Sequence, residues 1–415
     1  MNSLEQYFET IIQCVGSFYW AIGILLLFLK VPRCQEYGPY IRAKKFLAFT
    51  YWVMGTNLYV WLWLCHHDWH HLNPYVFFTD VSLFYLAAVF FGHSFCSLLD
   101  GSCARPKKLA IDLSTWLLMM CLLSFTLSSS VSPVLRYALM GVSLLMFLDL
   151  VVRFIVRFRR LYAQKSQMLE NYYSEDMQHF MFWTKKSIFF ILMSGVLALF
   201  TLCFGIFFNY VYQLYMVVIN LYIAISFINY ANQYGKLYSP VQEMKEEETV
   251  VTETEPRNLS VDNLENIFGS RLAQWIDDKK YLDMQFTIED LAVSMGTNKF
   301  YMSRYINGKY NTNFRSWVTG LRVEEAKAYM KQNPSFKMEE VALHSGFSSL
   351  SYFSKVFSRI EGMTPLAWRK ENLLIGGGKN TKSKEKGAAC MKIKVWERTL
   401  FPPLLDGKIS DSSSK

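Results

Sequence analysis

The hydrophobic positions of this chain form long uncharged runs in its first half and short periodic groups in its second half. The hydrocarbon core of a bilayer is about 30 Å thick, so a helix needs roughly 20 apolar residues to cross it. The uncharged runs therefore predict seven membrane-spanning helices. The predicted spans are Thr10–Leu29, Phe46–Cys65, Val81–Leu99, Leu113–Leu135, Tyr137–Val152 and two spans from the run 187–235, which divides near Asn209 and Tyr210.

The distribution of Lys and Arg among the loops predicts how these spans are oriented. Basic residues gather in the first, third and fifth loops and are missing from the second, fourth and sixth. Loops rich in Lys and Arg stay on the cytoplasmic side of a bacterial inner membrane. We therefore predict a multi-pass inner-membrane protein with its N-terminus outside and residue 236 in the cytoplasm.

Two later segments have no apolar periodicity. Residues 243–256 hold six acidic residues and one lysine, a composition that cannot bury a core. We predict a disordered acidic linker over 236–258. The tail at 373–415 is basic, contains the glycines 376–378 and ends in serines, and we predict that it is disordered too.

The periodicity becomes helical after Leu259. The apolar face of the first predicted helix consists of Leu264, Ile267, Leu272, Trp275 and Ile276. Thr287 and Asp290 have the spacing of a capping box, which predicts a helix start. Gly296 then predicts a turn, and Asn298 is a suitable cap for the next helix.

A longer helix and a second pair of short helices follow. The long helix is predicted over 314–330, and its buried face consists of Phe314, Trp317, Val318, Leu321, Ala326 and Met330. Met338 begins a short helix, Gly346 predicts a tight turn, and the last helix stops at Gly362. Each short pair is a helix-turn-helix pattern, which holds its second helix in an exposed position. We call this second helix the reading helix.

Residues of about 270–371 resemble the DNA-binding domain of the AraC/XylS family of transcription regulators. The matching residues are Leu291-Ala292, Gly296, Met302-Ser303-Arg304, Phe314, Arg322, Ala326, Val341-Ala342, Gly346-Phe347, Tyr352-Phe353, Phe357, Gly362, Thr364-Pro365 and Arg369. The resemblance implies two helix-turn-helix units that meet successive major-groove segments. The predicted fold is all-α, with a transmembrane bundle at 1–235 and the DNA-binding domain at 259–372. Asn311 replaces the usual glycine of the family and tolerates the same left-handed backbone.

The resemblance also implies which side chains would meet DNA. The first reading helix is expected to expose Lys299, Phe300, Ser303 and Arg304, and the second to expose Ser348, Ser349, Ser351, Tyr352 and Lys355. Arginine can form a bidentate contact with guanine, while serine and lysine can contact bases or phosphates. A plain surface charge is the alternative for Arg304. Tyr305, Phe353 and Phe357 are predicted to lie in the core.

Composition supports a membrane-embedded first half, and the motifs that the chain lacks argue against several classes of enzyme. The chain is 52% hydrophobic and 19% charged, which is little charge for a soluble protein of this length. Residues 257–372 carry 16 Lys/Arg and 13 Asp/Glu, so their nonspecific attraction to DNA is modest. We find no P-loop, GxSxG, HExxH, kinase or phospho-receiver pattern. We therefore expect no enzymatic activity and no cofactor.

The second loop contains the histidines His66, His67, His70 and His71 beside Trp69. Histidines one helical turn apart suit a zinc, nickel or copper ion, and they titrate near neutral pH. A metal site and a pH-sensing site remain open. A plain interfacial loop, with its tryptophan in the aromatic belt of the membrane, is the favoured interpretation.

Several polar residues lie inside the predicted spans. Asn57, His93, Asn220 and Asn229 either line a small cavity or form hydrogen bonds between helices, and we favour hydrogen bonds. Asp149 lies one turn before Arg153 and is expected to pair with it.

These patterns together predict a membrane-bound transcription regulator that couples an envelope signal to promoter binding. The expected partners are double-stranded DNA, the lipid bilayer and RNA polymerase. A homodimer and a small-molecule signal remain open. The alternative is a seven-span receptor or transporter whose C-terminal domain binds a protein. The polar residues expected to contact DNA on the two reading helices count against this alternative, because a protein-binding face is expected to gain apolar residues.

Overall fold

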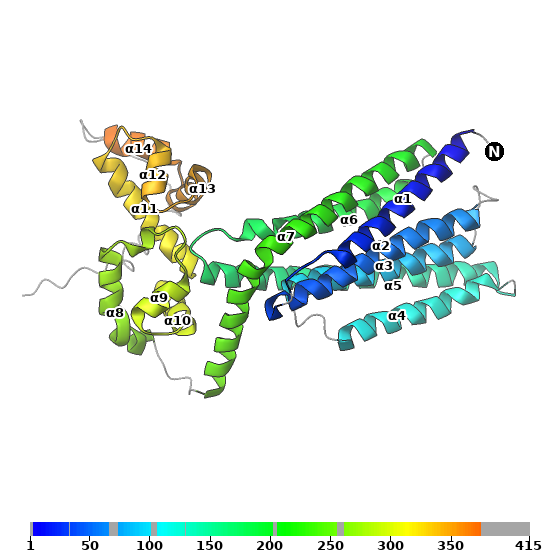
Figure 1. Cartoon of the computed structure of the whole chain (residues 1–415), viewed down its shortest axis with the longest axis horizontal. Coiled ribbons are helices and arrows are strands. Elements are labelled where there is room, and N and C mark those ends of the chain that lie inside the picture. The colour runs from blue at the N-terminus through cyan, green and yellow to red at the C-terminus, as the bar shows by residue number, and fades with distance from the viewer. Residues whose placement is uncertain are drawn as a thin grey trace, which may run out of the picture. The chain divides into compact units, whose positions relative to one another are not determined.

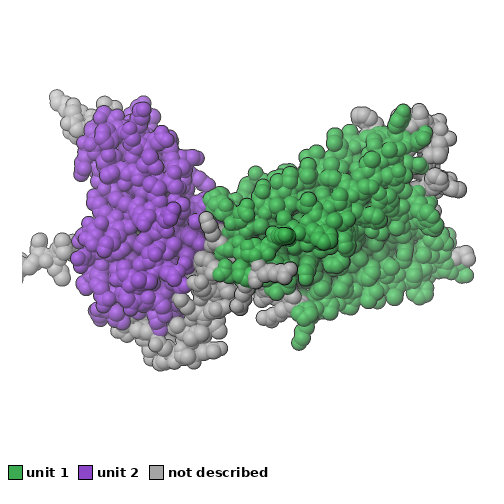
Figure 2. Space-filling view, in the orientation of Figure 1, with its two compact units in different colours: residues 1–167, 178–240 green, residues 168–177, 241–415 purple. Residues whose placement is uncertain are grey.

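The computed structural model of the protein describes residues 3–32, 34–65, 74–100, 106–128, 130–201, 206–254 and 261–374 (Figure 1). Within these ranges the regular structure is helical, and one isolated bridge joins Tyr173 to Thr287. The chain divides into two compact units (Figure 2). The first consists of Met1–Gln167 and Gln178–Pro240, and the second of Met168–Met177 and Val241–Lys415.

Seven long helices lie wholly or partly in the first unit. They are α1 (Ser3–Phe28), α2 (Gly38–Cys65), α3 (Pro74–Leu99), α4 (Pro106–Ser124), α5 (Pro133–Tyr172), α6 (Phe182–Thr201) and α7 (Ile206–Thr254). Six helical stretches in the described residues are long and apolar enough to cross a membrane. These are Gln6–Phe28, Pro74–Leu99, Pro106–Leu127, Pro133–Tyr172, His179–Ala198 and Phe208–Gly235.

The helix α2, which was predicted to contain a seventh span, is not among these six. It is long enough at 28 residues, but three tryptophans, three tyrosines and an asparagine reduce its hydropathy. In the structure α2 packs against both α1 and α3.

The predicted boundary between the fourth and fifth spans is wrong. Leu113–Leu135 is not one helix, because α4 ends at Ser124 and α5 begins at Pro133. Proline suits the first position of a helix, where its missing N–H costs nothing. The uncharged run hides this break, since charge and hydropathy do not change across it.

The predicted division of the run 187–235 near Asn209 is also misplaced. Asn209 and Tyr210 lie inside α7. The flanking helices end at Thr201 and begin at Ile206, so the division falls four to eight residues earlier than predicted. A polar residue inside an apolar helix keeps its backbone bonds and does not end the helix.

The segment predicted to be a disordered linker, 236–258, is helical as far as Thr254. Its acidic composition prevents the segment from burying a hydrophobic core but does not prevent it from forming a helix. Residues 241–254 contain no glycine or proline, and their glutamates, glutamine, lysine and methionine favour helices. Residues 255–258 and most of the predicted tail, 375–415, lie outside the described residues.

Polar groups in the first unit connect neighbouring helices. Asn57 donates to Asp80 (3.1 Å), linking α2 to α3. His93 and Asp112 lie 2.9 Å apart and link α3 to α4. Asn220 donates to the hydroxyl of Tyr19 (3.4 Å), linking α7 to α1. These contacts confirm the interpretation of interhelical hydrogen bonds at these three sites, whereas Asn229 is exposed. The predicted pair of Asp149 and Arg153 is confirmed at 2.8 Å.

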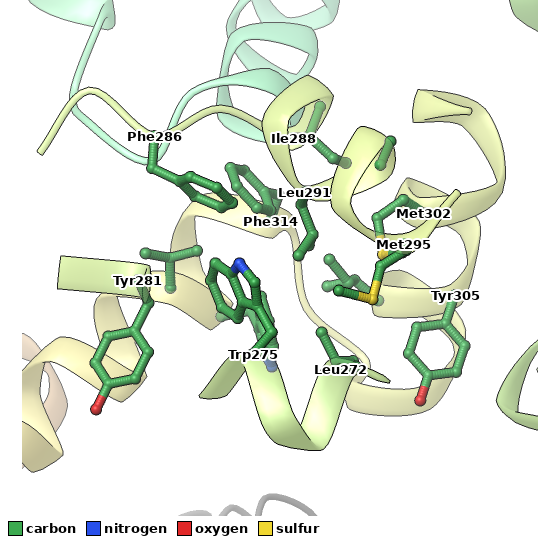
Figure 3. Packing of buried hydrophobic residues seen from close by; sticks show 14 of the residues in the cluster. Leu272, Trp275, Tyr281, Phe286, Ile288, Leu291, Met295, Met302, Tyr305 and Phe314 are labelled. Carbon is green, nitrogen blue, oxygen red and sulfur yellow. The ribbon is translucent and has the colours of Figure 1, made fainter. Parts of the chain in front are cut away.

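Seven α-helices lie wholly in the described part of the second unit. They are α8 (Val261–Asp277), α9 (Ile288–Met295), α10 (Lys299–Tyr310), α11 (Phe314–Gln332), α12 (Met338–His344), α13 (Leu350–Glu361) and α14 (Pro365–Leu374). Two hydrophobic cores share α11. The first packs α8, α9 and α10 on its N-terminal half (Figure 3), and the second packs α12, α13 and α14 on its C-terminal half.

Most predicted core positions of this unit are confirmed, but Ile276 is only partly buried. All six predicted residues of α11 are buried, and so are Tyr305, Phe353 and Phe357. Ile267 is instead 53% exposed, and its neighbour Phe268 is fully buried. The buried face of α8 runs through Leu264, Phe268 and Leu272, each one turn from the next, which leaves Ile267 on its edge.

Candidate nucleic-acid interface

The first reading helix is α10. A tight turn at Gly296, whose φ is +70°, separates it from α9. The side-chain oxygen of Asn298 accepts a hydrogen bond from the backbone N–H of Tyr301 (2.9 Å), which caps the helix start as predicted. At the other end Asn311 adopts the left-handed backbone expected of it, with φ +50°.

The four predicted contact residues of α10 do not share one environment. Arg304 is exposed and Phe300 is half-buried. Lys299 and Ser303 were expected to be exposed, but only 6% and 9% of their surfaces are accessible. The Lys299 ammonium lies 3.8 Å from a carboxylate oxygen of Glu289 and 6.0 Å from the ring centre of Tyr172. Tyr172 lies more than a hundred residues upstream, so no local pattern could have predicted this burial.

The second reading helix is α13. Gly346, with φ +78°, makes the turn after α12. Ser349 caps the helix, because its hydroxyl accepts from the N–H of Tyr352 (3.3 Å). Ser348, Ser349, Ser351 and Lys355 are exposed as expected. The start of α13 therefore presents a row of polar side chains on a helix anchored by buried phenylalanines.

Tyr352, the fifth predicted contact residue of α13, is half-buried because Arg315 lies against it. The guanidinium Nε donates to the Tyr352 hydroxyl (3.1 Å). Its Nη1 lies 3.6 Å from Glu170, and its Nη2 lies 3.1 Å from Asp176. Burial alone lowers the pKa of Arg315, but the tyrosine hydroxyl and the two carboxylates raise it above its ordinary value.

Arg315 was not among the contact residues predicted from the sequence. It lies in the first turn of α11, beside the apolar residues Phe314 and Trp317, and only its charge distinguishes it. Its acidic partners come from a distant part of the chain, which conceals the cluster from any inspection of local spacing.

Nothing in the structure bears on the histidines His66, His67, His70 and His71, since they lie at 66–73, outside the described residues. Among the described residues no three His, Cys, Asp or Glu side chains come close enough together to hold a metal ion.

Comparison with known proteins identifies this part of the chain. Residues 291–371, from α9 to α14, match the family model of a helix-turn-helix domain. They form a helix-turn-helix domain. The match includes both reading helices and the whole of α11.

Similar curated proteins are transcription regulators. The chain is 27% identical over 103 residues to the transcriptional activator NphR of a Rhodococcus species, which covers 25% of this chain and 30% of that protein. It is 31% identical over 84 residues to the uncharacterized HTH-type transcriptional regulator YisR of Bacillus subtilis (20% and 29%). It is 27% identical over 96 residues to the regulatory protein PocR of Salmonella typhimurium (22% and 31%). The chain thus spans less than a third of these relatives, and no solved structure matches it.

Proposed function

We propose that this protein is a membrane-bound, sequence-specific DNA-binding transcription regulator. In this proposal α10 and α13 are the two reading helices of a double helix-turn-helix, and they enter successive major-groove segments. The observation that carries the proposal is the exposed polar row of α13, Ser348, Ser349, Ser351 and Lys355, within a segment that matches the helix-turn-helix family.

The apolar surface of the first unit supports the membrane part of the proposal. Large hydrophobic side chains are exposed along its helices, including Leu25, Phe28, Val134, Leu145 and Leu214. Soluble proteins rarely expose apolar surface on this scale. We propose that α2 also crosses the bilayer, since it packs against two helices that qualify as spans, and that an envelope signal acts through this bundle.

Chromatin immunoprecipitation of the intact protein tests the proposed function. Discrete peaks at promoters are expected, because tethering to the membrane does not abolish sequence readout. A map without peaks would favour the alternative, a membrane receptor or transporter whose C-terminal domain binds a protein.

Lys355→Ala tests the role of the second reading helix. The purified full chain in nanodiscs should bind a recovered promoter fragment about tenfold more weakly after this change. The slope of log affinity against log salt should also fall by about one, as expected for one lost phosphate contact. Lys370→Ala is the matched control, because Lys370 is an exposed lysine on α14. Equal losses in both variants would exclude a specific role for α13.

A further inference from the structure

The second unit contains a segment that the helix-turn-helix domain does not explain. Met168–Met177, the end of α5 and the connection toward α6, belongs to this unit although more than 80 residues separate it from α8. We call it the docked segment. The same helix α5 begins at Pro133 in the first unit, so the chain enters the second unit twice, first through the docked segment and again at Val241.

The docked segment is bound through both backbone and side chains. Tyr173 forms a bridge with Thr287, and the N–H of Ser174 donates to the carbonyl of Phe286 (3.4 Å). The Ser174 hydroxyl donates to the same carbonyl (2.6 Å) and accepts from buried Arg322 (3.3 Å). Tyr172 is buried in the first core beside α9 and α10. These contacts give the segment one defined position on the domain.

Two carboxylates of the docked segment meet a buried arginine that contacts the second reading helix. Glu170 and Asp176 pair with Arg315, and Asn313 donates to Glu170 (3.1 Å). Arg315 lies two residues after the connection from α10 and contacts Tyr352 on α13. Its guanidinium therefore lies beside the second reading helix.

The chemistry of Arg315 suits a DNA phosphate as well as a carboxylate. A guanidinium offers forked donors that fit the paired oxygens of either group. The docked segment also covers Lys299, whose ammonium lies near the Tyr172 ring. Arg315 and Lys299 are thus both engaged by the chain's own residues.

We propose that Arg315 is a DNA-phosphate-binding residue, and that Glu170 and Asp176 compete with the phosphate for it. The docked segment then holds the domain in a state of low DNA affinity, and its release from Arg315 raises that affinity. This inference rests on the proposed function and adds the regulation of the same site. Because the docked segment continues α5, a rearrangement of that helix would change how strongly Glu170 and Asp176 compete with the phosphate for Arg315.

The test uses the full chain in nanodiscs and a fluorescein-labelled DNA duplex of arbitrary sequence, since a phosphate contact does not depend on sequence. Glu170→Gln with Asp176→Asn removes both competing charges and should tighten binding about tenfold. Asp277→Asn with Glu371→Gln is the matched control. It removes two exposed carboxylates of the same unit, so it measures the effect of net charge alone.

A double-mutant cycle with Arg315→Ala separates the proposed competition from general electrostatics. In the Arg315→Ala background the Glu170/Asp176 change should no longer tighten binding beyond the control. Tightening that persists without Arg315, or that equals the control, overturns the competition while leaving DNA binding intact. If no variant binds the duplex in a salt-dependent way, the proposed function itself fails, and the competition fails with it.

Hydrogen exchange gives a second measurement that needs no substitution. When the duplex binds the unaltered chain, the amide of Ser174 should exchange faster, because undocking breaks its hydrogen bond to the carbonyl of Phe286. Unchanged exchange at this amide in the DNA complex means that the segment stays docked, which also overturns the proposal.

Discussion

At the scale of single residues, Arg322 is an organising centre of the second unit. It is fully buried on α11. Its Nε donates to the carbonyl of Tyr281 (2.8 Å), and its Nη2 donates to the carbonyl of Asp283 (2.6 Å). Burial lowers the pKa of Arg322 to about 10, so it still carries its charge at neutral pH. It thereby fixes the connection between α8 and α9, which contains only a single 3-10 turn at Lys280–Leu282.

Arg322→Met is expected to destabilise this connection. The buried carbonyl of Tyr281 loses its donor, which costs about 1–3 kcal/mol, whereas the carbonyl of Asp283 still accepts from the N–H of Phe286. Hydrogen exchange by mass spectrometry should show faster exchange across residues 279–287. Arg359→Met, an exposed arginine on α13, is the control and should leave exchange there unchanged. Similar exchange in both variants would contradict the role of Arg322.

Glu265 gives a pH-dependent contribution to stability. Burial raises the pKa of this carboxyl, but hydrogen bonds from Lys309 and Tyr305 on α10 offset that effect and lower the pKa below 4.5. A lowered folded pKa stabilises the fold above the unfolded value, and this contribution is lost as the pH falls through the folded value. Because the carboxyl side chain is 42% exposed, the contribution stays below about 1 kcal/mol.

Glu265→Gln should therefore be less stable than the unaltered chain at neutral pH, and the difference should shrink as the pH drops below 4.5. Thermal unfolding of both proteins along a pH series measures this. A difference that stays constant down to the lowest pH would show that the charge of Glu265 contributes nothing.

At the scale of elements, the two turns that position α13 differ in how tightly they are enclosed. Gly346 and Gly362 both have left-handed backbones, with φ +78° and +75°. A side chain at Gly346 would meet the Leu282 carbonyl oxygen at 2.6 Å, whereas Gly362 has open space around it. The first turn thus packs α12 and α13 directly against the connection held by Arg322.

Substitution of the two glycines by alanine should separate conformational cost from steric cost. Gly362→Ala should lower the free energy of unfolding only by the strain of a left-handed backbone, roughly 1–2 kcal/mol. Gly346→Ala adds the collision with Leu282, roughly a further 1–3 kcal/mol. Calorimetry of the two variants compares these costs. Equal losses would mean that the connection yields without penalty.

Prediction of individual elements succeeded where the signal is local. The capping box of α9 is present, because Thr287 and Asp290 satisfy each other's backbone N–H groups. The helical faces of α9 and α11 follow from their spacing alone. Helix ends inside the uncharged runs were misplaced, because an apolar helix and an apolar helix break differ little in composition.

At the scale of the whole molecule, a fusion experiment tests whether α2 crosses the membrane. We expect alkaline phosphatase fused after Lys30 to be inactive, because the basic loop containing Lys30 and Arg33 stays in the cytoplasm, and the same enzyme fused after Leu72 to be active. If α2 does not cross, the two fusions lie on the same side and show the same activity. Immunoblots of both fusions control for expression.

The amino-acid sequence by itself determined the all-helical class, the apolar first half, and a helix-turn-helix domain whose second reading helix exposes Ser348, Ser351 and Lys355. These features depend on residues close together in the chain, through helical periodicity, capping and turn-forming glycines. They can therefore be predicted without knowledge of the fold.

Only the tertiary structure decided the surroundings of the first reading helix and of Arg315. Lys299 and Ser303 carry the sequence signature of surface residues, yet they are buried. Glu170 and Asp176 reach Arg315 from a segment more than 130 residues earlier in the chain. The physical reason is that burial and ion pairing depend on which distant segments share a core, and no local pattern in either segment encodes that partnership.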